Sequence, residues 1–210
     1  MLINQKKTKT MIFNYTNKYQ FTTRLNLNAE IVEVVPEVKL LGTFICNDLT
    51  WNKNTASLVK RANARMILLR KLSEFGAPIE QLKTIYTLYI RSVLEQSAVV
   101  WHSSLTQENS EDLSRVQKSA CKIILKNKYE SYEKSLEVLD LQDLSDRRQN
   151  LCKDFATKAA RNQSLGFSRH TKSHPMNTRN QSIYEVSHCN TERLLHSAIP
   201  QMQRLLNTLE

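Results

Sequence analysis

The pattern of apolar and polar residues changes its period near residue 50. Before it, apolar and polar positions alternate in short runs rich in β-branched residues, at 11–13, 30–35 and 39–45. Alternation with a period of two is typical of strands. The polar segment 26–29 predicts a turn, and Pro36 separates the last two runs. We therefore predict three short strands, which need a neighbouring element because so small a sheet cannot bury both faces alone.

From Thr50 onward, apolar residues recur at three- and four-residue steps, which is the period of an amphipathic helix. A first helix ends at the segment 76–78, and a second runs from Ile79 to Val93 towards Trp101 and is expected to be the most buried. The apolar stripe of the first helix consists of Val59, Ala62, Met66, Leu69 and Leu72.

A third helix is expected to begin at Asn109 or Ser110, since either side chain can cap it. Its inner face consists of Leu113, Val116, Ala120 and Ile123. Further helices are predicted at 132–139, at 144–161 and after Pro200, where Met202, Leu205, Leu206 and Leu209 form a small apolar stripe. The polar and basic segment 162–182 predicts a loop.

The scarcity of glycine, with 3 in 210 residues, disfavours a turn-rich all-β fold and favours helices joined by polar connections. The predicted fold class is therefore α+β and mainly α, with a small antiparallel strand unit followed by a helical bundle.

The chain is basic, with a formal net charge of +10. An excess of this size favours a polyanionic partner such as nucleic acid, although a charge that only aids solubility is the alternative. Two stripes of single sign support the first interpretation, and a solvated outer face is the alternative for each. One stripe consists of Lys53, Lys60 and Lys71, and the other of Arg115, Lys118, Lys122 and Lys126.

The residues offer little for catalysis or for metal binding. Two-metal nucleotidyl transfer needs paired carboxylates, and the sequence has no Asp-Asp pair; Asp140 and Asp143 lie at a helix junction where capping explains them better. His170 and His174, followed by His188-Cys189, fit the order and spacing of a zinc finger poorly. We expect no cofactor.

Nothing at the N-terminus has the apolar core of a signal peptide, and no apolar run approaches the length of a membrane span. The four cysteines are widely spaced, which fits a reducing compartment. We therefore expect an intracellular protein of the nucleus or cytoplasm, with no membrane partner.

Several strings of residues, in order and over nearly the whole chain, resemble the reverse transcriptase of non-LTR (LINE-like, jockey-type) retrotransposons. Residues 3–13 contain Asn4, Lys7 and Thr8 of an N-x-x-K-T motif, and residues 38–52 carry a K-x-L-G element with a downstream L-x-W. Residues 88–106, 113–124 and 192–207 are similar to the helical thumb, its connection and the end of such reading frames.

By this resemblance, the chain comprises the end of the palm with a primer-grip-like turn (1–48), a helical thumb and connection (49–161), and a basic loop with a C-terminal helix (162–210). Leu41 and Gly42 are then expected near the primer end. Lys39, Lys53, Lys60, Arg61 and Lys71 are expected to face phosphates of template or primer, and Arg115, Lys118 and Lys122 are the further candidate contacts.

The family's catalytic aspartates belong to a motif that comes before the segment resembled by residues 3–13, so we expect no polymerase activity from this chain alone, and the Mg²⁺ that the family uses would lack its carboxylate ligands. The predicted function is non-specific binding of RNA or an RNA–DNA hybrid by a truncated, retrotransposon-derived protein. The alternatives are a repurposed protein-interaction module, with self-association through the open palm edge, and the C-terminal part of an RNA-directed DNA polymerase whose catalytic residues lie upstream.

Overall fold

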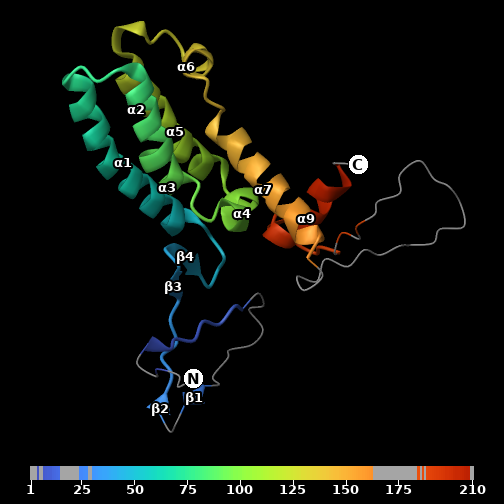
Figure 1. Cartoon of the computed structure of the whole chain (residues 1–210). Coiled ribbons are helices and arrows are strands. Elements are labelled where there is room, and N and C mark those ends of the chain that lie inside the picture. The colour runs from blue at the N-terminus through green and yellow to red at the C-terminus, as the bar shows by residue number, and fades with distance from the viewer. Residues whose placement is uncertain are drawn as a thin grey trace, which may run out of the picture. The chain divides into compact units, whose positions relative to one another are not determined.

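Helices make up most of the structure, and short strands precede them (Figure 1), which confirms the predicted mainly α, α+β class. The computed structural model describes residues 4, 7–14, 24–27, 30–162, 184, 186 and 188–208. The chain divides into two units, Met1–Ser57 and Leu58–Glu210, and the boundary between them falls within the first long helix. The three-part division at residues 48 and 161 stays a prediction.

The strands of the first unit form two separate antiparallel hairpins. Strand β1 (Asn26–Leu27) pairs with β2 (Glu30–Ile31), and β3 (Glu37–Leu40) pairs with β4 (Thr43–Cys46). An isolated parallel bridge joins Thr10 to Val34. Two-stranded hairpins are only marginally stable by themselves, and the expectation that this region needs a neighbour stays a prediction.

The predicted strand boundaries are wrong in three places. The run 11–13 lies in no strand, and in the run 30–35 only Glu30 and Ile31 belong to one. The run 39–45 is interrupted by a two-residue turn at Leu41 and Gly42, whose φ angles are 47° and 88°. Two successive residues with positive φ characterise the type I′ turn of a tight hairpin, and glycine supplies the second without strain.

Three stretches of helix form the first half of the second unit. Helix α1 (Asn52–Glu74) is followed by α2 (Ile79–Ile85), which continues through the π-helix η2 (Tyr86–Arg91) into α3 (Ser92–Leu94). A left-handed residue, Ser97 with φ 55°, then starts α4 (Ala98–Trp101) and the short 3₁₀ helix η3 (His102–Ser104). The predicted second helix is therefore helical along its whole length, but it is not a regular α-helix, because its middle has the wider π form.

The remaining helices are α5 (Gln107–Leu125), the 3₁₀ turn η4 (Lys126–Lys128), α6 (Tyr132–Leu139), α7 (Leu144–Ala160), α8 (Glu192–Leu195) and α9 (Ala198–Asn207). The predictions for α6 and α7 are confirmed to within a residue. The prediction for α5 is wrong at its start, because Thr106 and not Asn109 or Ser110 caps it; Thr106 Oγ1 accepts a hydrogen bond from the Asn109 amide at 3.2 Å. Helix α9 begins two residues before Pro200, since proline is tolerated in a first helical turn.

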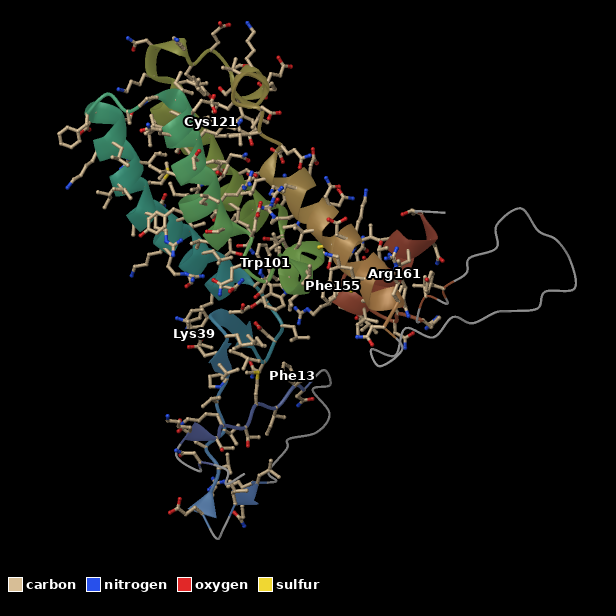
Figure 2. The ribbon with its side chains drawn as sticks, viewed as in Figure 1. Phe13, Lys39, Trp101, Cys121, Phe155 and Arg161 are labelled. Carbon is tan, nitrogen blue, oxygen red and sulfur yellow. The ribbon has the colours of Figure 1, made fainter. Side chains whose placement is uncertain are left out.

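The core of the second unit lies where α5 packs against α2, α6 and α7, and where α7 packs against α4 and α9. Trp101, on α4, is fully buried (Figure 2), as are Tyr86 and Ile90 of the π-helix. The two tryptophans of the chain, Trp51 and Trp101, are 8% and 0% exposed. Among the described residues, no helix is both long and apolar enough to cross a membrane.

Candidate nucleic-acid interface

The hairpin β3–β4 presents the first group of predicted contact residues. Leu41, at its tip, is 90% exposed, and Gly42 follows it in the turn. Lys39, on β3 (Figure 2), has its Nζ 5.3 Å from the centre of the Phe44 ring. Lys53, at the start of α1, has its Nζ 5.1 Å from the centre of that ring and forms an ion pair with Glu37. Lys39 and Lys53 are thus both already held by contacts with residues of the hairpin.

Helix α1 carries six basic residues but a single acidic one, Glu74, which is its last residue. Lys60 and Lys71 are exposed, and the side chain of neither forms a hydrogen bond or ion pair within the part of the chain that the structure describes. They are eleven residues apart, which at about 100° per residue places them within about 20° of each other around the helix. Ala64 and Ile67 lie between them at four- and three-residue steps and are exposed as well. We call these four residues the outer face of α1.

Arg61 lies off this face and points into the second unit. Its Nη1 donates a hydrogen bond to Gln96 Oε1 at 2.9 Å. Burial, and then the charge of Arg65, lower its pKa. The structure therefore separates Arg61 from Lys60 and Lys71, with which the sequence had grouped it.

The basic stripe of α5 is present, but each of its cations has a partner. Arg115 forms an ion pair with Asp112 at 2.7 Å, and Lys126 donates to the backbone carbonyl of Ser73. Lys118 lies over the ring of Tyr132, with Nζ 5.0 Å from its centre, and Lys122 lies over that of Tyr129 at 5.4 Å. Contacts between a cation and an aromatic ring are worth about 0.5–1 kcal/mol at exposed sites. An approaching phosphate has to compete with these contacts.

A second gathering of positive charge surrounds the turn 95–97 after α3, and sequence reasoning missed it. Arg147, on α7, donates from Nε to Glu95 Oε1, and Arg91 Nε lies 3.5 Å from that oxygen. Trp101 Nε1 donates to the backbone carbonyl of Gln96 at 2.9 Å. With Arg61 bonded to the side chain of Gln96, arginines from α1, η2 and α7 meet at this turn.

Arg148 extends this group into the interior. It is fully buried, and its guanidinium carbon lies 5.9 Å from the centre of the Trp101 ring. Its Nε lies 3.4 Å from His102 Nδ1 and its Nη2 lies 3.5 Å from Ser110 Oγ, both at the long end of hydrogen bonding. Burial lowers the pKa of Arg148, while the charges of Asp143 and Glu95 oppose this effect. We call Arg61, Arg91, Arg147 and Arg148 the arginine cluster.

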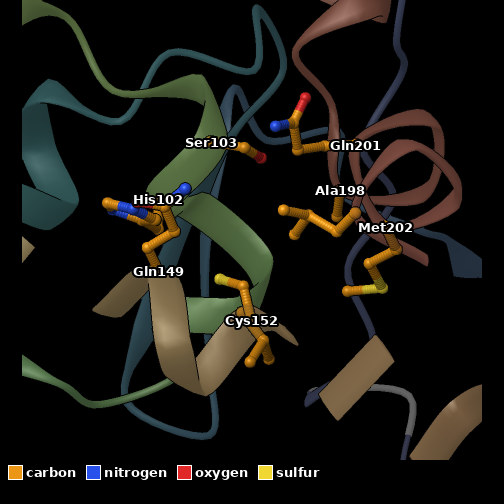
Figure 3. A pocket seen from close by; sticks show the side chains of 9 residues that line it. His102, Ser103, Gln149, Cys152, Ala198, Gln201 and Met202 are labelled. Atoms are coloured by element: carbon orange, nitrogen blue, oxygen red, sulfur yellow. The ribbon is translucent and has the colours of Figure 1, made fainter. Parts of the chain in front are cut away.

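His102 joins the arginine cluster to a small cavity. Burial, and then the charge of Arg148, lower the pKa of His102 to about 4, so its imidazole is neutral at physiological pH. The cavity, of about 80 Å³, lies among η3, α7 and α9 (Figure 3). Apart from His102, its lining includes Gln149, Cys152, Gln201 and Met202. Burial raises the pKa of the Cys152 thiol to about 11, which keeps it protonated and poorly nucleophilic.

The carboxylates considered for metal binding have structural roles. Asp143 caps α7, because its Oδ1 accepts from the Ser145 amide at 2.7 Å, and its Oδ2 accepts from the Tyr132 hydroxyl at 2.8 Å. Asp140 ends α6 in a left-handed conformation. Among the described residues, no three or more His, Cys, Asp or Glu side chains gather as metal ligands would. His170 and His174 lie outside the described residues.

No family model, curated protein or solved structure matches this chain. The likeness to retrotransposon reverse transcriptases therefore stays a prediction from the sequence. The stretch 88–106, which carries part of that likeness, contains Arg91, Glu95 and Trp101 of the group around the turn. It was the one signal in the sequence that pointed to this region.

Proposed function

We propose that the chain binds RNA or an RNA–DNA hybrid without sequence preference, through contacts of the outer face of α1 with backbone phosphates. The observation that carries the proposal is the six-to-one excess of basic over acidic residues on this helix, with Lys60 and Lys71 exposed. At 1.5 Å of rise per residue, the two ammonium groups are anchored about 16 Å apart along the helix, which is far enough for each to engage a separate phosphate.

The other predicted contact residues are assigned smaller parts. Lys39, Lys53, Lys118 and Lys122 already lie against aromatic rings, so binding a phosphate either displaces these contacts or adds to them weakly. Leu41 lies at the tip of a hairpin, where its large side chain is exposed and its backbone adopts the left-handed conformation. Strained and exposed apolar residues are more common where a ligand is contacted, and this favours Leu41 as a contact to sugar or base.

The proposal includes the absence of polymerase activity from this chain alone. It rests on the likeness to non-LTR retrotransposon reverse transcriptases and on the lack of an Asp-Asp pair in the sequence. Nucleotidyl transfer of that kind requires carboxylates around two metal ions. Activity in a mixture would thus require another chain to supply them.

The test compares two double variants that remove the same charge. Fluorescence anisotropy is recorded for a labelled RNA–DNA hybrid and for a single-stranded RNA across a salt series. Changing Lys60 and Lys71 to glutamine together should reduce the slope of log K against log salt by about 1.4 to 1.8, because each lost phosphate contact contributes about 0.7 to 0.9 to that slope. Changing Lys118 and Lys122 to glutamine together is the matched control, and we expect a clearly smaller change.

Two results would contradict the proposal. If the wild-type protein is folded and monodisperse but binds neither probe at low salt, the chain does not have the proposed nucleic-acid function. If both double variants reduce the salt dependence of binding equally, binding cannot be assigned to the outer face of α1. Circular dichroism of each variant establishes that the helices are intact.

The second candidate function, a protein-interaction module, has an observation in its favour. Phe13 and Val34 are 41% and 47% exposed, and the bridge between Thr10 and Val34 brings the two segments that carry them together. Exposed apolar side chains next to unpaired strand edges are typical of surfaces that bind another chain. Sedimentation of the wild-type protein over a range of concentrations tests this alternative, since self-association through this edge predicts a concentration-dependent mass.

A further inference from the structure

The arginine cluster holds more positive charge than its surroundings neutralise. Arg61, Arg91 and Arg147 contact residues of the turn 95–97, and Arg148 is buried against Trp101. Glu95 is the one carboxylate with which any of the four forms an ion pair among the described residues. Asp143 acts on Arg148 as well, but its oxygens accept from the Tyr132 hydroxyl and the Ser145 amide. Like charges without a counter-ion are costly in a partly buried region. A bound anion would therefore lower the electrostatic cost of this arrangement.

Several donors of the cluster are buried and form no hydrogen bond within the part of the chain that the structure describes. They are Arg61 Nε and Nη2, Arg148 Nη1 and Arg91 Nε, the last of which faces Glu95 Oε1 at the 3.5 Å of an ion pair. Buried polar atoms are nearly always partnered in proteins, by the chain itself or by a bound species. Arg148 is fully buried and still leaves one donor unused.

The cluster also reaches the surface. The Arg147 side chain is 32% exposed, and Arg61 is half-buried at the middle of α1. Part of the cluster is thus in contact with solvent. Guanidinium groups present a planar fork of N–H donors that matches the oxygens of a phosphate better than a chloride ion does.

We propose that the arginine cluster is a binding site for a phosphate-class oxyanion, held by Arg61, Arg91 and Arg147 and supported by the buried charge of Arg148. The site is distinct from the outer face of α1, and it does not rest on nucleic-acid binding there. Its ligand comes either from free phosphate or from the terminal phosphate of a polynucleotide, because both offer the same oxygens to the guanidinium groups.

Inorganic phosphate is the probe for the test. Isothermal titration and thermal unfolding of the full chain are followed as phosphate is added at constant ionic strength. We expect saturable binding, with the unfolding midpoint rising by about 3 to 6 °C for each tenfold increase of phosphate above its dissociation constant. Phosphate also stabilises proteins in general by exclusion from their surface, but that effect does not saturate and is the same in all variants.

Three variants locate the site. Arg147→Gln and, independently, Arg61→Gln should each weaken phosphate binding at least about tenfold, as the loss of a charge-assisted hydrogen bond predicts. Two variants on different helices are used because Arg147→Gln also removes the ion pair with Glu95 and can impair folding. Lys158→Gln removes an exposed charge from the same helix as Arg147 and should leave binding unchanged.

Absence of saturable binding to the wild-type chain would overturn the proposal, and so would equal binding by the wild-type chain and the folded arginine variants. Competition then identifies the source of the ligand. If a short 5′-phosphorylated oligonucleotide displaces phosphate and its 5′-hydroxyl counterpart does not, the site accepts a polynucleotide end. If neither displaces phosphate, the site binds the free ion.

Discussion

At the level of single residues, the lowered pKa of His102 makes the stability of the fold depend on pH. Its pKa is lowered from 6.5 to about 4 in the folded chain. Between these values the unfolded chain binds a proton that the folded chain does not, so the stabilising contribution is complete above pH 6.5 and declines as the pH falls towards 4. A buried histidine beside an arginine thus makes the folded state sensitive to acid.

The corresponding prediction concerns the variant His102→Gln. Lowering the pH from 7 to 4.5 should reduce the free energy of unfolding of the wild-type chain by about 2 kcal/mol more than that of the variant. Urea unfolding at each pH measures the difference. His196→Gln is the matched control, because the imidazole of His196 is exposed and its Nε2 lies 3.4 Å from Glu192 Oε2. A difference between wild type and His102→Gln that does not change with pH would contradict the assignment.

Single residues also show how far the sequence determines the candidate site. Helical spacing alone places Lys60 and Lys71 on one exposed face, because it depends only on the period of the helix. The same spacing cannot show that Lys118 lies over Tyr132, fourteen positions away, or that Arg61 turns inward to Gln96. Those contacts depend on how the helices pack, and the residues next to Arg61 or Lys118 in the sequence do not indicate them.

At the level of elements, the side chain of Asn207 connects the short helix α9 to Tyr184, which precedes it in the sequence. Asn207 Oδ1 accepts from the Tyr184 amide at 3.0 Å, and Asn207 Nδ2 donates to the Tyr184 carbonyl at 2.9 Å. The Tyr184 side chain packs with Ala156, Met202 and Leu206 in a small apolar cluster. The two hydrogen bonds therefore hold in place a residue that joins α7 to α9.

Changing Asn207 to alanine should release this connection. Losing both hydrogen bonds is expected to cost about 1 to 2 kcal/mol, and hydrogen exchange of the α9 amides should accelerate accordingly. Ile199→Ala serves as the comparison, since Ile199 is 60% exposed on the same helix and should change the exchange little. Equal exchange in Asn207→Ala and wild type would show that the cluster alone holds α9.

The elements differ in how well the sequence predicts them. Long helices with a sustained stripe, such as α1 and α7, are predicted to within two residues because many positions repeat one signal. The strands are predicted poorly because each offers only two to four residues. The run 39–45 looks like one strand, and only the backbone angles of Leu41 and Gly42 reveal the turn within it. The π-helix η2 has no sequence signature of its own.

At the level of the whole molecule, composition predicted the class of the fold and an excess of charge, but not where that charge lies. The net charge of +10 is distributed among cations held by rings or carboxylates, the exposed lysines of α1, and the arginine cluster. Net charge sets long-range attraction to a polyanion. Which residues then make contact is decided by the partners each cation already has.

The central claim is that nucleic acid contacts the outer face of α1. Lysine acetylation footprinting, with mass spectrometry of the chain free and saturated with an RNA–DNA hybrid, tests it most directly. The account predicts that modification of Lys60 and Lys71 falls strongly in the complex, while modification of Lys158 on α7 does not change. If Lys60 and Lys71 react equally in the free and the saturated protein, the outer face of α1 does not bind nucleic acid and the account is wrong.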